Sequence, residues 1–271
     1  MNLVNQKQIE TIIESIRKTA KYRSVSLDLI KAIAEQEFIK RRNLKEAIKS
    51  AKNKLHQVGG AYMAQKINYE QILEQFQIIV ESNNQDELFR FSAEIINTHA
   101  STKERLQILD KFYQEIFAQI PPVKSILDIA CGLNPLTIPW MKLNDNVTYH
   151  AYDIYEDMIQ FLNNYMKIMK IKGSAKVCDV IQKCPTEKVD VAFIFKTLPC
   201  LEQVDKNAGI HLLESINAKY LFVSFPIYSL GSKYKGMATN YETKFKEMME
   251  QTNWLDKKIE FSNELVFLVT K

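Results

Sequence analysis

Apolar residues recur every three or four positions through the first part of the chain, from about residue 8 to residue 79. The positions that share this spacing are Ile9, Ile12, Ile13 and Ile16, then Leu44, Ile48, Ala51 and Leu55, then Ile72, Leu73 and Phe76. This spacing places apolar side chains on one face of a helix. Breaks at residues 22–26 and at Gly59-Gly60 divide the segment into three or four helices. We expect a helical domain over residues 1–84, because these apolar faces need a partner and the polar stretch 82–86 ends the pattern.

Short apolar runs alternate with helical patterns in the rest of the chain, residues 85–271. We expect strands near 126–130, 147–152, 175–178, 189–195, 220–225 and 264–270, and helices near 87–96, 102–117, 156–170, 206–217 and 241–249. Strands that alternate with helices favour a mainly parallel sheet covered by helices on both sides. The sequence therefore predicts an α/β domain that follows the helical domain along the chain.

Acidic residues lie at or near the ends of three predicted strands: Asp128, Asp153 and Asp179. The first strand runs directly into a turn of small residues around Gly132, where a nucleotide-like ligand can approach the backbone. Asp153 follows Asp128 by 25 residues, close to the spacing of about 20 between a nucleotide turn and the acid that binds ribose hydroxyls. The pattern favours a ligand with a ribose and an exocyclic amine, although single acids at strand ends are common.

The composition narrows the class of protein. The 271 residues are 46% apolar and 25% charged, the proportions of a soluble globular protein. No apolar run approaches the ~18 residues of a membrane span, and residues 1–8 lack a signal-peptide pattern, so we expect a cytoplasmic protein without a membrane partner. The four cysteines fall singly and the histidines are unpaired, which favours buried thiols over a disulfide framework or a metal site.

Positive charge is concentrated at the front of the chain. Residues 1–80 carry 14 Lys and Arg against 8 Asp and Glu, whereas residues 81–271 carry 22 against 24. The basic residues on one face of a predicted helix are Arg41, Lys45, Lys49 and Lys52, and those that broaden this face are Lys40, Arg42 and Lys54. Such a face is either an ordinary solvated helix surface or a surface that binds successive phosphate groups. The sequence leaves both interpretations open.

Three ordered motifs resemble one enzyme family. They are His99-Ala100-Ser101-Thr102-Lys103-Glu104-Arg105-Leu106, Asp128-Ile129-Ala130-Cys131-Gly132-Leu133-Asn134-Pro135-Leu136, and Ser224-Phe225-Pro226 through Ser229-Leu230-Gly231 to Lys235-Gly236-Met237 and Asn240-Tyr241-Glu242. Together with Lys54-Leu55-His56-Gln57 and Gly60-Ala61-Tyr62, they resemble the aminoglycoside-resistance methyltransferases that use S-adenosylmethionine to methylate N7 of guanine 1405 in 16S rRNA. The resemblance covers nearly the whole chain. It implies a Rossmann-like class I methyltransferase with a seven-stranded, mainly parallel sheet and an amino-terminal helical domain.

The resemblance also implies a site for S-adenosylmethionine, with no metal. Arg105 would pair with the methionyl carboxylate of the cofactor, and Asp153 would hold its ribose. The other implied contacts are Tyr62, His99, Ala100, Ser101, Ala130, Gly132, Ile154, Asp179, Val180 and Phe195. Arginine suits a carboxylate because its planar guanidinium donates two parallel hydrogen bonds.

The implied reaction needs no general base, because guanine N7 carries a lone pair and no proton. N7 lies on the major-groove edge of the base, which side chains cannot reach in A-form RNA, so the guanine must leave its helix and be held by stacking. The residues expected to form the base pocket are Phe225, Pro226, Met237 and Tyr241, although Phe225 equally suits the core. The chain departs from the family at Tyr228, where members commonly carry a basic residue.

The basic helical domain is expected to dock a monomeric enzyme on the 30S ribosomal subunit. The residues expected to contact RNA are Lys21, Arg41, Lys45, Lys49, Lys52, Lys54, Lys233 and Lys235. Two alternatives remain open. A module that binds the ribosome or RNA without chemistry would fit Tyr228, and a methyltransferase for a small molecule or a protein would fit the negative balance after residue 81.

Overall fold

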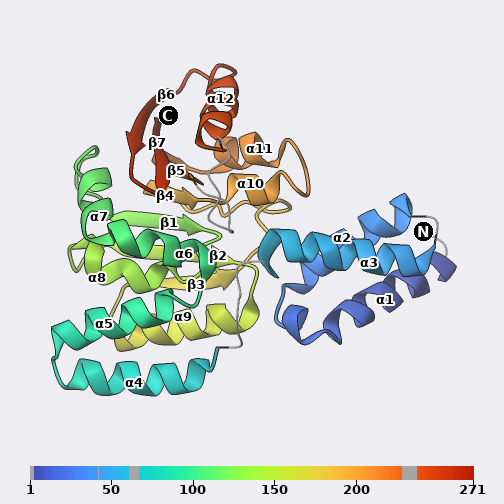
Figure 1. The fold of residues 1–271 in the computed structure, drawn as a ribbon, viewed down its shortest axis with the longest axis horizontal. Coiled ribbons are helices and arrows are strands. Elements are labelled where there is room, and N and C mark those ends of the chain that lie inside the picture. The colour runs from blue at the N-terminus through green and yellow to red at the C-terminus, as the bar shows by residue number, and fades with distance from the viewer. Residues whose placement is uncertain (1–2, 42, 61–66, 228–236) are drawn as a thin grey trace.

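The computed structural model describes residues 3–41, 43–60, 67–227 and 237–271 (Figure 1). Three amino-terminal helices form a unit at one side of the molecule: α1 (Leu3–Arg17), α2 (Leu27–Lys40) and α3 (Leu44–Leu55). The predicted apolar stripes of α1 and α3 face inward together with apolar residues of α2, so that Ile12, Ile30 and Ala51 are completely buried. A 3₁₀ turn (Ala20–Tyr22) precedes α2, and a π-helical turn (His56–Gly60) continues α3. We call α1 to α3 with these two turns the helical unit.

A seven-stranded sheet forms the centre of the remaining chain. Its strands are β1 (Ser125–Ile129), β2 (Thr148–Asp153), β3 (Gly173–Val177), β4 (Val189–Phe195), β5 (Ala218–Pro226), β6 (Leu255–Glu260) and β7 (Glu264–Thr270). The strand order is β3-β2-β1-β4-β5-β7-β6, and β7 runs in the direction opposite to the other six strands. The predicted mainly parallel sheet is confirmed. The order reverses between β1 and β4, which is where open α/β sheets bind ligands, at the carboxyl ends of the strands.

The sequence pattern contains no sign of β6. Five of its six residues are exposed, including Leu255, because β6 is the edge strand and pairs only with β7. Asp256, Lys257 and Lys258 interrupt any apolar alternation. Charged side chains on an edge strand discourage pairing with other chains.

Helices cover both faces of the sheet. The first face carries α4 (Tyr69–Glu81), α5 (Gln85–Ile96), α7 (Leu109–Phe117), α8 (Ile138–Met141) and α9 (Glu156–Ile168), and the second carries α10 (Leu198–Leu201), α11 (Ala208–Ser215) and α12 (Met237–Met249). The short helix α6 (Ala100–Arg105) leads towards β1. Alternate residues of β4 face opposite layers, with Phe193 in one core and Ile194 in the other. Among the described residues, no helix has both the length and the apolar character that crossing a membrane requires.

Helix α4 packs on the α/β domain and not on the helical unit. The ring of Tyr69 stacks on Phe161 of α9 with centroids 4.7 Å apart, and Phe76 meets the rings of Phe91 and Tyr165 edge-on at 4.9 Å. The predicted division at residue 84 places α4 with the helical domain. The apolar stripe of α4 is equally suited to either partner, and its packing favours a division between α3 and α4.

We expect Phe76→Ala to lower the free energy of unfolding by about 3–5 kcal/mol, because it empties a fully buried position shared by α4, α5 and α9. Ile78→Ala on the same helix is the matched control, since Ile78 is 59% exposed and its loss should cost about 0.5 kcal/mol. Urea denaturation followed by circular dichroism measures both. Equal losses would contradict the described packing of α4.

Candidate active site

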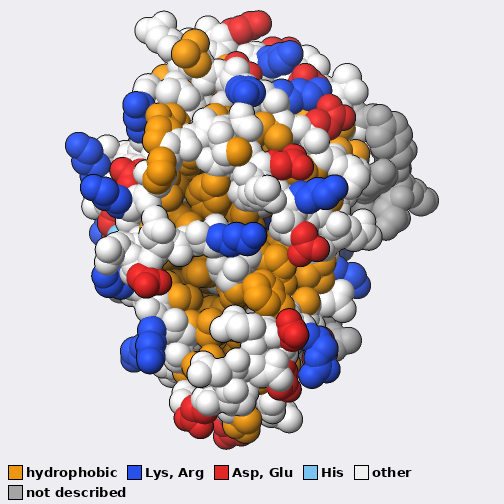
Figure 2. Space-filling view, turned by 90° about the vertical axis from the view of Figure 1, so that its left-hand side faces the viewer, with side chains coloured by type: hydrophobic (Ala, Val, Ile, Leu, Met, Phe, Trp, Pro, Cys, Tyr) orange, Lys and Arg blue, Asp and Glu red, His pale blue; other side chains and the backbone are white. Residues whose placement is uncertain are grey.

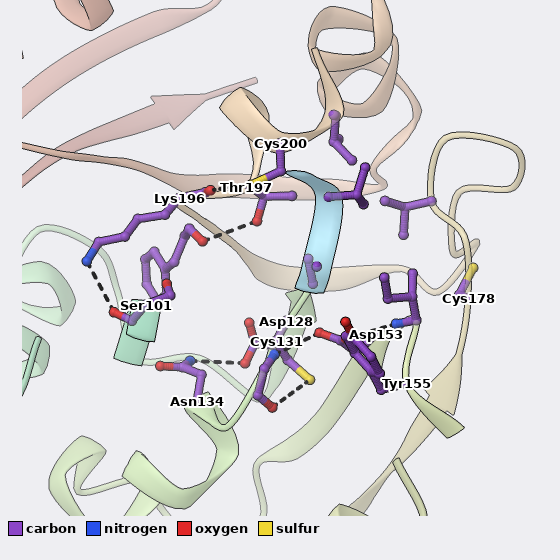
Figure 3. Close-up of a pocket in the computed structure, with 18 of the residues that line it drawn as sticks. Ser101, Asp128, Cys131, Asn134, Asp153, Tyr155, Cys178, Lys196, Thr197 and Cys200 are labelled. Atoms are coloured by element: carbon purple, nitrogen blue, oxygen red, sulfur yellow. Dashed lines mark hydrogen bonds between the residues drawn. The ribbon is translucent and has the colours of Figure 1, made fainter. Parts of the chain in front are cut away.

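A cavity opens at the carboxyl ends of β1 to β4 (Figure 3). The predicted cofactor residues that line it are His99, Ser101, Arg105, Ala130, Gly132, Asp153, Ile154, Asp179, Val180 and Phe195. Ala100 begins α6 but is not part of the lining, and Tyr62 lies outside the described residues. Residues that are distant in sequence thus meet around one cavity.

The turn after β1 brings the backbone to the cavity. Ala130 and Gly132 both adopt left-handed conformations, with φ of 51° and 52°. Gly132 also has no room for a side chain, because an added Cβ would lie 2.7 Å from Cε1 of His99. Ala130 holds its conformation at a cost of roughly 1 kcal/mol. The turn therefore requires glycine at position 132, both for its backbone conformation and because His99 packs against it.

Asp153 connects this turn to β2. Its Oδ2 accepts a hydrogen bond from the Gly132 amide at 2.9 Å, and its Oδ1 accepts one from the Ile154 amide at 2.7 Å. Burial raises the pKa of Asp153 above its usual value, while these backbone hydrogen bonds act in the opposite direction. Asp179 accepts hydrogen bonds from the Ile181 amide and the Gln182 side chain, both at 3.1 Å, and burial also raises its pKa. Each carboxylate keeps lone pairs with which to accept hydrogen bonds from a ligand.

Arg105 forms a buried ion pair with Glu264, the first residue of β7. Its Nη2 and Nε donate to the two carboxylate oxygens at 2.6 and 3.1 Å, and Nη1 donates to Asn134 Oδ1 at 2.8 Å. The guanidinium lies 4.6 and 4.3 Å from the ring centroids of Phe112 and Phe195. Burial opposes the charge on Glu264, but Arg105 holds the pKa of that carboxyl below its usual range. The sequence singles out Arg105 without indicating this partner.

Lys196 is a second cation in the cavity wall, to which the sequence assigns no role. It follows β4 in a left-handed conformation with φ of 56°. Its Nζ lies 2.7 Å from a carboxylate oxygen of Glu104 and 3.4 Å from Oε2 of Glu264. Lysine directly after an apolar strand, and an acid that opens one, are the available sequence signals for Lys196 and Glu264. Both are common, so neither identifies a site alone.

Asp128 and His99 are two further buried residues that line the cavity. Asp128 lies within β1, and its Oδ2 accepts hydrogen bonds from the Tyr149 hydroxyl at 2.6 Å and from Asn134 at 3.0 Å. Burial raises its pKa to about 6. Burial, together with the charge of Lys196, lowers the pKa of His99 to about 4, so its imidazole is neutral at pH 7. Among the described residues, no group of His, Cys, Asp and Glu side chains is arranged to hold a metal ion.

The family model described as "Ribosomal RNA methyltransferase (FmrO)" matches residues 18–268. The chain belongs to this family. A 16S rRNA (guanine(1405)-N(7))-methyltransferase from Micromonospora rosea is 31% identical over 266 residues, 97% of each chain. One from Serratia marcescens is 30% identical over 263 residues, 97% of this chain and 98% of the relative.

Solved structures agree with this family assignment. The 16S rRNA methyltransferase RmtF, crystallised with S-adenosyl-L-homocysteine, has a TM-score of 0.82 at 26% identity and covers 100% of this chain and 99% of its own. The 16S rRNA methylase RmtB has a TM-score of 0.79 at 27% identity over 97% of this chain and 98% of its own. The predicted class I methyltransferase fold and the predicted family are confirmed.

The predicted base-pocket residues of this rRNA methyltransferase do not line the cavity. The rings of Phe225 and Tyr241 stack with centroids 5.1 Å apart and planes 22° apart. Phe225 is buried and also contacts Phe245 in the core, whereas Pro226 and Met237 are half-buried. Phe225 therefore serves core packing, and its role in binding a base stays a prediction.

The predicted RNA-binding residues differ in how freely they face solvent. Lys45 and Lys49 are exposed on α3, and Lys52 is half-buried. Arg41 and Lys54 form ion pairs of 2.9 and 3.0 Å with the fully buried Glu37, which the sequence did not single out. Lys21 Nζ lies 3.0 Å from His56 Nδ1, and Lys233 and Lys235, like Tyr228, lie outside the described residues. On the side of the molecule away from the helical unit, Lys and Arg are interspersed with Asp and Glu around a hydrophobic hollow (Figure 2).

We expect Glu264→Gln to lower the free energy of unfolding by about 3–5 kcal/mol, because it leaves Arg105 buried without its counter-charge. The loss relative to the wild type should shrink as pH falls through the lowered pKa of Glu264, since protonation removes the same charge. Glu260→Gln on β6 is the control: its side chain is 64% exposed, and its ion pair with Lys258 should contribute less than about 1 kcal/mol. Guanidinium denaturation from pH 7 down to about pH 2 measures both, because the pKa of Glu264 lies below its usual value. A pH-independent loss would contradict this assignment.

Proposed function

We propose that this protein transfers the methyl group of S-adenosylmethionine to N7 of guanine 1405 of 16S rRNA within the 30S subunit, which confers resistance to aminoglycosides. The observation that carries the proposal is the extent of the match. Relatives named for this reaction align with 97–98% of the chain, through the helical unit as well as the α/β domain. We further propose that the enzyme works in the cytoplasm as a monomer.

The cavity is lined by side chains of the kinds that S-adenosylmethionine requires, cationic and acidic ones among them. Lys196 and Ser101 lie on one side, and Asp153 and Cys178 lie on the other (Figure 3). Arg105 and Lys196 line the side that would take the methionyl carboxylate, where each is also paired with a glutamate. Asp153 offers acceptors for ribose hydroxyls. Asp179 and Val180 would hold an adenine, one by hydrogen bonding and the other by apolar contact.

When bound, the cofactor supplies a methyl group on a positively charged sulfur. The residues of the cavity position the reactants and do not transfer protons. Gly132 leaves room for the His99 ring against the turn, and neutral His99 adds no like charge to a cavity that would take a cation. Since N7 loses no proton, alignment of N7 with the methyl group supplies the catalysis.

The target guanine needs a surface on which to stack once it has left its helix, at a cost of a few kcal/mol. Ser224 of β5 pairs with Phe195 of the cavity wall, so Phe225 and Pro226 lie at the strand end next to the cavity. Tyr241 stacks on Phe225, and Met237 begins the same helix. We assign the binding of the target guanine base to these four residues.

The helical unit supplies the docking surface for the subunit. Lys45 and Lys49 are exposed on one face of α3 and are available to phosphate groups. The other proposed RNA contacts are Lys21, Arg41, Lys52, Lys54, Lys233 and Lys235. Phosphate contacts set orientation, and the shape of the subunit selects the nucleotide.

Expression in a susceptible bacterium should modify guanine 1405 and raise resistance to gentamicin-type drugs. Borohydride reduction and aniline scission of 16S rRNA, followed by primer extension, locate N7-methylated guanines. Asp153→Asn should abolish the modification, because it removes the carboxylate assigned to the ribose. Asp190→Asn is the matched control, since Asp190 likewise accepts two backbone amides, at 2.6 and 3.1 Å, but at the far end of the sheet.

Unmodified rRNA in cells that contain the soluble wild-type protein would contradict the proposed reaction. Binding of S-adenosylmethionine by the purified protein then separates the remaining possibilities. A protein that binds 30S subunits but no cofactor is a non-catalytic module. One that binds the cofactor but no subunits has another substrate.

The double change Lys45→Glu and Lys49→Glu should weaken 30S binding by about tenfold or more and reduce the slope of log K against log salt by about 2. Lys111→Glu with Lys167→Glu is the control, because these lysines are equally exposed on α7 and α9, away from the helical unit. Fluorescence anisotropy over 50–200 mM salt measures both variants. An unchanged slope for the α3 variant would rule out this docking surface.

A further inference from the structure

The helical unit forms part of the cavity wall. Leu29 of α2, and Val58 and Gly59 of the turn after α3, line the same cavity as Asp153 and Asp179. That turn continues α3 directly. The helix that presents Lys45 and Lys49 therefore ends in the wall of the proposed cofactor site.

A short antiparallel bridge joins the helical unit to the segment after β2. Val25 pairs with Tyr155. The Ser26 amide donates to the Ile154 carbonyl at 2.7 Å, and the Glu156 amide donates to the Ser24 carbonyl at 2.7 Å. We call these contacts the seam. Because Ile154 directly follows Asp153, the carboxylate assigned to the ribose and the seam belong to one short segment.

The seam is reinforced by a side chain. Ser24 Oγ donates to Asp157 Oδ2 at 2.8 Å, at the start of α9. Ser24 is half-buried and lies outside the cavity lining. Its hydroxyl is thus a contact between the two parts of the molecule that touches no ligand.

Gly59 sets how closely the helical unit approaches the cavity. An added Cβ would lie 2.9 Å from Tyr155 Oη and 3.0 Å from Ile154 Cδ1. Tyr155 is itself buried, so its ring has little space to withdraw. The φ of Gly59 is outside the left-handed range, so the requirement for glycine is one of space. A larger residue would push the turn away from Ile154 and Tyr155.

We infer that Gly59 is a positioning residue and that cofactor binding and docking on the 30S subunit are linked through the seam. Cofactor bound in the cavity restricts the motion of the segment after Asp153. Through the seam, this segment then holds α3 and its lysines in one orientation. By thermodynamic reciprocity, docking on the subunit then raises the affinity for the cofactor by the same factor. This inference rests on the proposed function and goes beyond it, because neither binding event alone requires the other.

The test measures the affinity of the full-length protein for 30S subunits with and without saturating S-adenosylhomocysteine, and the affinity for S-adenosylhomocysteine with and without subunits. Linkage predicts the same factor in both measurements, about 5-fold or more. Equal affinities within twofold, with both ligands bound, overturn the linkage and leave the proposed function intact. No binding of subunits at all overturns the proposed function and the linkage together.

Gly59→Ala should weaken S-adenosylhomocysteine binding to the free protein about 5–10-fold and bring the linkage factor close to one. Affinity for subunits without cofactor should change less than about twofold, since the proposed docking contacts of Lys45 and Lys49 are not altered by Gly59→Ala. Gly209→Ala is the matched control: it lies in α11, and its Cβ would meet its nearest atom, Met248 Cε, at an ordinary 3.4 Å. Wild-type cofactor affinity and linkage in folded Gly59→Ala overturn the positioning role.

Ser24→Ala provides a second variant if Gly59→Ala fails to fold by circular dichroism. It removes the hydrogen bond to Asp157 and creates no overlap. The linkage factor should fall at least about threefold, because the seam loses a contact made to a charged group. An unchanged factor overturns the role of the seam.

Discussion

A buried ion pair between Arg105 and Glu264 connects parts of the chain that are 159 residues apart. Either charge alone would be strongly unfavourable in this interior, so both must become buried together. Ser224 donates a hydrogen bond to the Glu264 carboxylate, Lys196 forms a second ion pair with it, and two aromatic rings lie beside the guanidinium. Since Glu264 opens β7, the buried position of Arg105 depends on the pairing of the antiparallel strand with the sheet. Formation of the cavity thus depends on completion of the sheet.

The cations of the cavity wall are paired with glutamates on one side, and carboxylates that can accept further hydrogen bonds from a ligand lie on the other. Glu264 and Glu104 balance Arg105 and Lys196 on one side. On the other, Asp153 uses two backbone amides and retains further lone pairs. Such a site can orient a polar cofactor without moving a proton, which suits methyl transfer to an atom that carries only a lone pair.

The helical unit has two separate relations to the rest of the molecule. Its own core is formed by apolar helix faces, and the buried Glu37 forms ion pairs with two of the basic side chains. Its contact with the α/β domain is a backbone bridge beside the cavity. The proposed docking surface and part of the cavity wall therefore lie on one continuous element, α3 with its following turn.

The sequence by itself determined the alternation of strands and helices, the small-residue turn after β1, the acids Asp153 and Asp179 and the family to which the chain belongs. Those features are local, because periodicity, turn chemistry and motif spacing involve residues close along the chain. Only the tertiary structure decided that α4 joins the α/β domain, that β6 forms an edge, that Glu264 holds Arg105 and that Arg41 and Lys54 turn to Glu37. An amphipathic stripe does not specify the element that it packs against, and a charged residue does not specify its ion-pair partner. Both are set by which distant segments the packed core brings together.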